Sequence, residues 1–166
     1  MARQLWLLRH AEAEPHGVRP DSERRLTERG KQQARVAGLA LKRMEVSFDA
    51  VLFSPKARAR ETAELAVEAW DEEERARMRE YQALAGGFEA AHALEALSSV
   101  GADGRVLVVG HEPDLSRVVA ELTGGRVDLK KGGLAVVRLE NASGELVILM
   151  RPRELALIAG IPGGGD

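Results

Sequence analysis

The chain has 166 residues, of which 45% are hydrophobic, and this size and composition predict a globular protein with one core. Its 24 basic and 26 acidic side chains give a formal net charge of -2, so no overall positive field selects nucleic acid or an anionic membrane as a partner. The chain has no cysteine and no apolar run of membrane-spanning length, which excludes disulfides and thiolate metal sites and favours a cytoplasmic protein.

The first third of the chain predicts a strand, a long loop and a helix. Residues 4–8 form an apolar run typical of a buried strand, which stops abruptly at Arg9 and His10. Residues 11–25 have no usable period, and a loop of that length in a compact domain commonly lines a site. Thr27 is a candidate helix N-cap, and the helix after it carries apolar residues at helical spacing: Ala34, Ala37, Leu41 and Met44.

The middle of the chain predicts a second strand followed closely by a helix. Residues 50–53 read as a short buried strand, and Ser54-Pro55 is a helix-start signal. Apolar residues then recur at helical spacing at Ala59, Ala63, Ala66 and Trp70. Residues 71–80 are almost wholly charged, and the sequence leaves two interpretations open: a solvated helix end, or a linker into a short edge strand near residues 78–81.

The last part of the chain predicts two more helices, a buried strand and a hairpin. Ala90, Leu94 and Leu97 recur at helical spacing and predict one helix. A buried strand is predicted over residues 105–109. A second helix is predicted after it by the helical spacing of Leu115, Val118, Val119 and Leu122. Residues 134–139 and 145–150 flank a four-residue turn at 141–144, which indicates a hairpin and at least one antiparallel strand.

The alternation of strands and helices predicts an α/β fold. We expect a three-layer α/β/α sandwich with a mostly parallel central sheet and at least one antiparallel strand, because right-handed crossovers place helices on both faces. Residues 1–161 are predicted to form a single domain, and residues 162–166 a flexible C-terminal tail.

Basic side chains follow three of the predicted strands, at the point where each strand ends. The first strand ends in Arg9 and His10, the second leads to Arg58 in the first turn of its helix, and the strand at 105–109 is followed by His111. Ligands of open α/β sheets bind beyond the carboxyl ends of the strands. Four cationic or potentially cationic groups on one rim would repel one another without an anion between them, so the sequence predicts an anion site there.

These residue types suit phosphoryl transfer. Arginine forks match the oxygens of a phosphoryl group, and a neutral imidazole can attack phosphorus to give a phosphohistidine that water then hydrolyses. This chemistry needs no metal and no cofactor. A metal-dependent hydrolase remains an alternative, but Arg9 and Arg58 would disfavour a dication on its candidate ligands, which are His10, Glu12, His111 and Asp114.

Three motifs resemble those of the histidine phosphatase superfamily. Residues 7–11, Leu-Leu-Arg-His-Ala, resemble its Arg-His-Gly signature, with Ala11 in place of the glycine. Residues 54–62 are similar to its Ser-Pro-x-x-Arg-Ala-x-x-Thr element, and residues 108–111 match its second histidine after a buried strand. The order and spacing of the motifs agree over essentially the whole chain. The resemblance therefore implies a phosphoglycerate mutase-like fold.

Within that superfamily the chain looks most like the SixA-type phosphohistidine phosphatases, which are short and lack the cap insertions of the mutases. Residues 24–27, Arg-Arg-Leu-Thr, resemble the Arg-Pro-Leu-Thr segment of that branch. The resemblance implies that His10 is the nucleophile and that Arg9 and Arg58 bind the phosphate. It also implies that His111 contacts the transition state and that Arg24 is an auxiliary phosphate contact. Inorganic phosphate or a mimic would occupy the same site.

The proton donor of the family has no clear counterpart in this sequence. When the chain is aligned with the family's motifs, Gln82 falls near the position of the acidic proton donor. Glu80 and Glu89 are possible substitutes for that donor only because they are close to it in sequence. An imidazole leaves phosphorus easily, since its pKa is about 6.5, whereas an alkoxide needs a strong acid. A missing acid therefore favours phosphohistidine over ordinary esters as the substrate.

The function predicted from the sequence is a metal-independent phosphatase that forms a phosphohistidine intermediate and dephosphorylates phosphohistidine on a protein. A phosphatase of small phosphate esters is the alternative within the superfamily, and a mutase is a weaker one. A noncatalytic phosphate-binding module is the alternative from another class. Lys130 and Lys131, which precede the hairpin, are interpreted as a basic loop turn.

Overall fold

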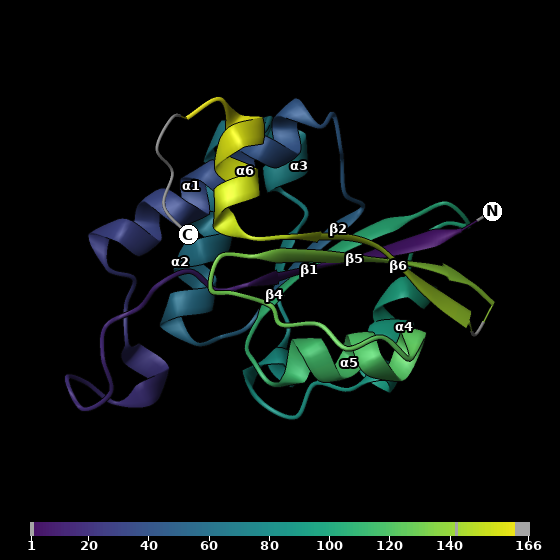
Figure 1. Ribbon diagram of the computed structural model, residues 1–166, viewed down its shortest axis with the longest axis horizontal. Helices are drawn as coiled ribbons and strands as arrows, with labels where there is room; N and C mark the ends of the chain where they lie inside the picture. Colours follow the sequence, from purple (N-terminus) through teal and green to yellow (C-terminus); the bar gives the residue numbers. More distant parts are fainter. Residues whose placement is uncertain (1, 142, 162–166) are drawn as a thin grey trace.

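The computed structural model describes residues 2–141 and 143–161, and its centre is a six-stranded sheet in the order β3-β2-β4-β1-β5-β6 (Figure 1). Neighbouring strands among the first four are parallel, whereas β5 runs antiparallel to both β1 and β6. This confirms the predicted mixture of strand directions. The strands are β1 (Arg3–Arg9), β2 (Ala50–Phe53), β3 (Met78–Glu80), β4 (Arg105–Gly110), β5 (Leu134–Glu140) and β6 (Ser143–Met150).

Helices cover both faces of the sheet, which confirms the three-layer α/β/α sandwich (Figure 1). One layer contains α1 (Glu28–Arg43), α2 (Ala57–Ala66), α3 (Glu72–Arg75) and α6 (Pro152–Ala159), and the other contains α4 (Ala90–Ser98) and α5 (Asp114–Thr123). Short 3-10 turns lie at η1 (Asp21–Glu23), η2 (Val67–Ala69) and η3 (Gln82–Ala85). Over the described ranges, none of these helices is long and apolar enough to cross a membrane.

Both faces of the central strands are buried, which explains why these strands are continuous apolar runs in the sequence. Along β1, Leu5 and Leu7 pack in the core cluster beneath α4 and α5, while Trp6 and Leu8 pack in the cluster beneath α1 and α6. The same alternation holds along β4. The two cores pack on opposite faces of the sheet, and loops follow the carboxyl ends of β1, β2 and β4.

Helix α1 packs closely on the end of α2, and Gly38 marks the point of contact. A Cβ at position 38 would lie 1.7 Å from the carbonyl oxygen of Ala66. The Trp70 indole Nε1 also donates a hydrogen bond to the Gly38 carbonyl, at 2.9 Å. The backbone at the end of α2 therefore leaves no room for a side chain at position 38 of α1.

We expect Gly38→Ala to lower the free energy of unfolding by about 3 kcal/mol, because a clash with backbone outweighs the better helix propensity of alanine. Urea denaturation followed by circular dichroism measures the change. Gly101→Ala is the matched control, since no atom lies within 4 Å of a Cβ at that position. A Gly38→Ala protein as stable as the control would show that the two helices are not held at this distance.

Three local features differ from the sequence prediction or resolve it. The charged segment at 71–80 contains both a short helix, α3, and the edge strand β3, so each interpretation describes part of it. The hairpin strands pair as far as Glu140 and Ser143, so the turn is shorter than four residues. In α4 the buried face is formed by Ala93, Ala96 and Leu97, and Leu94 is 40% exposed, so the predicted apolar stripe was rotated from the true one.

The sequence analysis missed helix α6. Its signals are local ones, since Pro152 stands at the start of the helix and Gly160 ends it with a left-handed conformation. Leu155 and Ala159 bury their side chains against the α1 layer. Residues 162–166, predicted to be a flexible tail, lie outside the described residues, so the predicted domain boundary stays a prediction.

Candidate functional site

The ends of β1, β2 and β4 lie side by side, and this brings the predicted site together. Arg9 pairs with Gly110 in the parallel register, and the His10 amide donates to the Gly110 carbonyl at 3.0 Å. The rings of His10 and His111 are 5.2 Å apart between centroids. A cavity of about 310 Å³ is lined by Arg9, His10, Arg24, Arg58 and His111, together with Ala13, Glu14, Pro15, His16, Glu112 and Lys131.

The His10 ring is buried and fixed in one tautomer. Its Nδ1 lies 2.8 Å from the carbonyl oxygen of Ala11, and because a carbonyl only accepts, Nδ1 carries the proton and Nε2 keeps a lone pair. The Thr62 hydroxyl holds this segment by accepting from the Ala11 amide at 3.1 Å. Burial, with the positive charges of Arg58 and Arg9, lowers the pKa of His10 to about 3, so the ring is neutral at pH 7.

The second histidine, His111, is also buried and neutral. Burial, reinforced by His10 and Arg58, lowers the pKa of His111 to about 3. Its Nε2 lies 2.8 Å from the Ser54 hydroxyl oxygen. When that hydroxyl donates, the proton of the ring sits on Nδ1, which is buried and has no hydrogen-bond partner among the described residues. His111 can therefore offer a donor to a ligand.

Arg9 and Arg58 are each anchored by one end of the guanidinium. Arg9 Nη1 donates to the Leu129 carbonyl at 2.9 Å, and Arg58 Nη1 donates to the Asp21 carbonyl at 2.7 Å. The Nε atoms of both are buried and unpartnered within the described part of the chain. A buried donor left without a partner costs about 1–3 kcal/mol. Arg9, Arg58 and His111 line the same cavity, and the donors that they carry suit an anion.

Asp21, on the loop before α1, is a site residue that the sequence analysis missed. Its carboxylate contacts Arg24 Nη2 at 3.0 Å, Arg58 Nη2 at 3.3 Å and Lys56 Nζ at 3.4 Å. Partial burial opposes ionisation, but these three cations hold the pKa of Asp21 well below its usual range. Asp21 therefore orients both Arg24 and Arg58. The only sequence signal was the unusual length of its loop.

Glu80 and Glu89, the substitutes considered for the proton donor, are not among the residues that line the cavity. Glu80 lies at the end of β3 and pairs with Arg60 Nη2 at 2.6 Å. Glu89 precedes α4 and is exposed. The carboxylates that do line the cavity are Glu14 and Glu112.

Glu14 and Glu112 both act as hydrogen-bond acceptors. Glu14 accepts from Arg19 Nε at 2.7 Å, which lowers the pKa of Glu14. One oxygen of Glu112 accepts from the Ser116 amide at 2.8 Å, and the other accepts from the Ser116 hydroxyl. Hydrogen-bond donors thus engage the carboxyl groups of both residues.

Lys131 also lines the cavity, so its interpretation as part of an ordinary basic turn was incomplete. The turn is tied to the end of β1, because the Gly132 amide donates to the carbonyls of Arg9 and His10 at 3.1 and 3.0 Å. The charge of Lys131 contributes to lowering the pKa of His10. The conformation of the turn places the Lys131 charge at the cavity, and no periodicity in the sequence indicates that position.

The candidate metal ligands are not assembled. Asp114 accepts hydrogen bonds from the amides of Gly87 and Phe88 at 2.9 and 3.2 Å, and Glu12 accepts from the Thr27 hydroxyl at 2.8 Å. Within residues 2–141 and 143–161, no group of three or more histidine, aspartate or glutamate side chains is placed to hold a metal ion.

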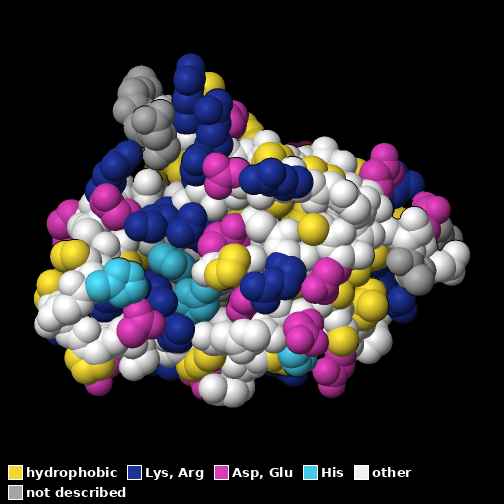
Figure 2. Space-filling model, turned by 60° about the horizontal axis from the view of Figure 1, so that its bottom comes forward, with side chains coloured by type: hydrophobic (Ala, Val, Ile, Leu, Met, Phe, Trp, Pro, Cys, Tyr) yellow, Lys and Arg dark blue, Asp and Glu magenta, His cyan; other side chains and the backbone are white. Residues whose placement is uncertain are grey.

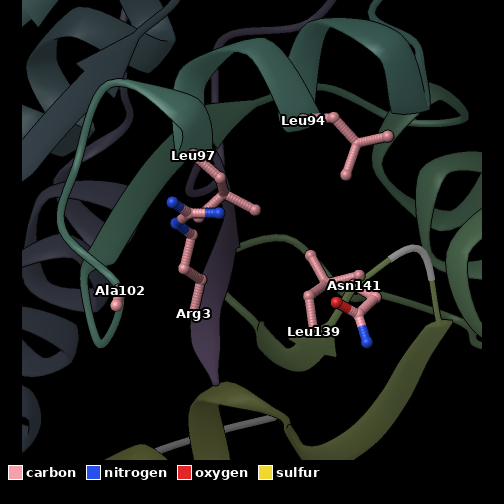
Figure 3. Close-up of a pocket in the computed structure, with 6 residues that line it drawn as sticks. All are labelled: Arg3, Leu94, Leu97, Ala102, Leu139 and Asn141. Carbon is pink, nitrogen blue, oxygen red and sulfur yellow. The ribbon is translucent and has the colours of Figure 1, made fainter. Parts of the chain in front are cut away.

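Figure 2 shows histidine side chains grouped in a hollow, with Lys and Arg side chains around them. A second cavity, of about 190 Å³, lies at the amino end of β1, where Arg3 Nε donates to the Gly101 carbonyl at 3.3 Å (Figure 3). Its lining includes one charged side chain and no histidine: Arg3, Leu94, Leu97, Ala102, Leu139 and Asn141. The chemistry therefore concentrates at the other end of the sheet.

The low pKa of His10 and of His111 predicts a pH-dependent stability. Each has a folded pKa of about 3 against about 6.5 in the unfolded chain. Below pH 6.5 the unfolded chain takes up protons that the folded protein does not, so stability falls as the pH drops. By pH 5 the loss should be about 2 kcal/mol for each histidine.

Urea denaturation at pH 7 and pH 5 in phosphate-free buffer measures this loss. The difference between the two pH values should shrink in a His10→Asn protein. An unchanged difference would show that folding does not lower the pKa of His10.

Comparison with known proteins agrees with this geometry. The sequence model of the histidine phosphatase superfamily (branch 1) matches residues 5–89. A phosphohistidine phosphatase SixA homolog of Haemophilus influenzae is 32% identical over 129 residues, which cover 74% of this chain and 78% of that protein. The chain therefore belongs to the histidine phosphatase superfamily.

Solved structures give the same result. The protein histidine phosphatase SixA complexed with tungstate is 29% identical, with a TM-score of 0.78 over 92% of this chain and 99% of the other. Phosphoglycerate mutase from Bacillus anthracis is 14% identical and shares the fold, with a TM-score of 0.71 over 95% of this chain and 96% of the other. The fold is thus phosphoglycerate mutase-like, and the relationships support phosphatase activity.

Proposed function

We propose that this chain is a metal-independent phosphatase that uses His10 as a nucleophile and removes the phosphoryl group from phosphohistidine on a protein. One observation carries the proposal. A neutral His10 ring, fixed with its proton on Nδ1, lines the same cavity as Arg9, Arg58 and His111, each of which has a buried donor atom without a partner among the described residues. Tungstate, which the SixA structure contains, is a tetrahedral oxyanion like phosphate.

In the first step His10 Nε2 attacks phosphorus, and the bond between phosphorus and the leaving group breaks. Charge then spreads over three equatorial oxygens. Arg9 and Arg58 bind these oxygens through their guanidinium groups, and His111 donates a hydrogen bond through Nδ1. Arg24, which pairs with Asp21, is an auxiliary contact to the phosphoryl group. In the second step water attacks the phosphohistidine, inorganic phosphate leaves, and the His10 lone pair is restored.

The carboxyl groups around the cavity support phosphohistidine as the proposed substrate. Glu14 and Glu112 are held as acceptors, and Glu80 and Glu89 lie elsewhere. An ester would need one of them as a strong acid. A phosphohistidine needs none, because its own ring takes up a proton near neutral pH and departs as neutral imidazole. The likeness to SixA proteins supports the same substrate.

The test compares kcat/KM on a phosphohistidine protein, a phosphorylated small molecule and an aryl phosphate, all in the presence of a chelator. We expect the phosphohistidine protein to be preferred and the chelator to have no effect. Turnover lost on chelation would contradict the metal-independent mechanism. Preference for the small ester would replace the proposed substrate with the alternative one.

A further inference from the structure

A larger hollow adjoins the cavity around His10. Its volume is about 690 Å³, and it shares Arg9 and Lys131 with the cavity. Helix α1, the turn before β5 and the residue before α6 contribute the other basic side chains. The lining residues are Arg9, Glu12, Arg29, Gln33, Lys130, Lys131 and Arg151. Figure 2 shows Lys and Arg side chains continuing past the histidines on this face.

The hollow has an excess of positive charge, because five of its lining residues are basic and one is acidic. The ion pairs at its rim are exposed: Lys130 pairs with Asp128 at 2.7 Å, Arg151 with Glu154 at 3.0 Å, and Arg29 with Glu12 at 3.8 Å. In each pair the basic side chain is 55–56% exposed. Exposed pairs are weak and are readily exchanged for a ligand.

The two sides of the His10 cavity differ in how their charge is balanced. On one side, Asp21 neutralises part of the charge of Lys56, Arg24 and Arg58. On the other side, no described carboxylate lies within 4.0 Å of the Lys131 ammonium. A phosphoryl group bound by Arg9 would therefore have the charge of Lys131 near it, and that charge is in no ion pair with a described carboxylate.

We propose that this hollow binds a second anionic group of the substrate, a carboxylate carried by an acidic side chain close to the phosphohistidine. The proposal rests on the proposed function, which places the phosphoryl group in the adjoining cavity. Arg9 borders both spaces, so the two anions would bind next to each other. Arginine forks at positions 29 and 151 suit bidentate recognition of a carboxylate. The substrate class is thus narrowed to phosphohistidine segments with an acidic neighbour.

The test uses two phosphohistidine peptides that differ only in an aspartate or asparagine beside the phosphohistidine. The wild-type protein should prefer the aspartate peptide about tenfold in kcat/KM, mainly through KM, and the preference should shrink as salt is raised. In an Arg29→Gln, Arg151→Gln double variant the ratio should fall to about one. Arg35→Gln is the control, because Arg35 also lies on α1 but pairs with Glu68 outside the hollow, and it should keep the ratio.

The outcomes separate the two proposals. Equal kcat/KM on both peptides would overturn the second anion site while leaving the proposed function intact, whereas no turnover of either peptide would overturn the proposed function. Phenyl phosphate and its 4-carboxylate derivative form a second pair of substrates. A carboxylate preference confined to that pair would contradict the protein source and indicate a small anionic ester.

Discussion

The His10→Ala protein should lose turnover by at least about 10⁴-fold in kcat while remaining folded. Alanine removes the only atom proposed to form a bond to phosphorus, so binding can persist but the covalent step cannot. Release of inorganic phosphate from a phosphohistidine protein measures the loss, and circular dichroism checks the fold.

A histidine outside the cavity provides the matched control. His92 accepts a hydrogen bond from the Glu89 amide at 3.0 Å and stacks on Phe88, with ring centroids 5.9 Å apart. His92→Ala should weaken the start of α4 and leave kcat unchanged. Undiminished turnover in His10→Ala would remove the nucleophile assignment.

The Arg58→Ala protein should lose about 3 kcal/mol of transition-state stabilisation, which is a loss of roughly 100-fold or more in kcat/KM. Arg58 is 5% exposed, and its buried Nε has no partner in the part of the chain that the structure describes. Removing it also leaves the Asp21 carboxylate less neutralised beside the cavity, where it would repel a phosphoryl group. Both effects act in the same direction. Steady-state kinetics on the preferred substrate measure their sum.

Arg60→Ala is the control for Arg58→Ala. Arg60 lies on the same helix, but it is exposed and pairs with Glu80. Its loss should change kcat/KM by less than about twofold, as expected for a surface ion pair. If Arg58→Ala changed kcat/KM as little as the control, phosphate binding would have to be assigned to other residues.

The sequence was sufficient to predict the residues that follow parallel strands. Arg9, His10 and His111 come directly after β1 and β4, and the register of those strands fixes their neighbours. Arg58 was predicted because a helix-start signal precedes it. These positions depend on where a buried strand ends and on the phase of a helix, and the pattern of apolar residues indicates both.

Residues delivered by loops could not be predicted in this way. Asp21 reaches Arg58, which is 37 positions away, through a loop without a period. Lys131 reaches the cavity because the Gly132 amide bonds to the end of β1. Leu94 was assigned to a buried face by its helical spacing from Ala90 and Leu97, whereas the structure buries Ala93 and Ala96 beside Leu97. In each case a tertiary contact decides the position.

The most direct test of the account is to find the residue that carries the phosphoryl group during turnover. The protein is mixed with a phosphohistidine protein, quenched in alkali within one turnover, digested and analysed by mass spectrometry. The account predicts a phosphoryl group on His10, and none in the peptide that contains His111. A phosphoryl group on any other residue would contradict the proposal that His10 is the nucleophile.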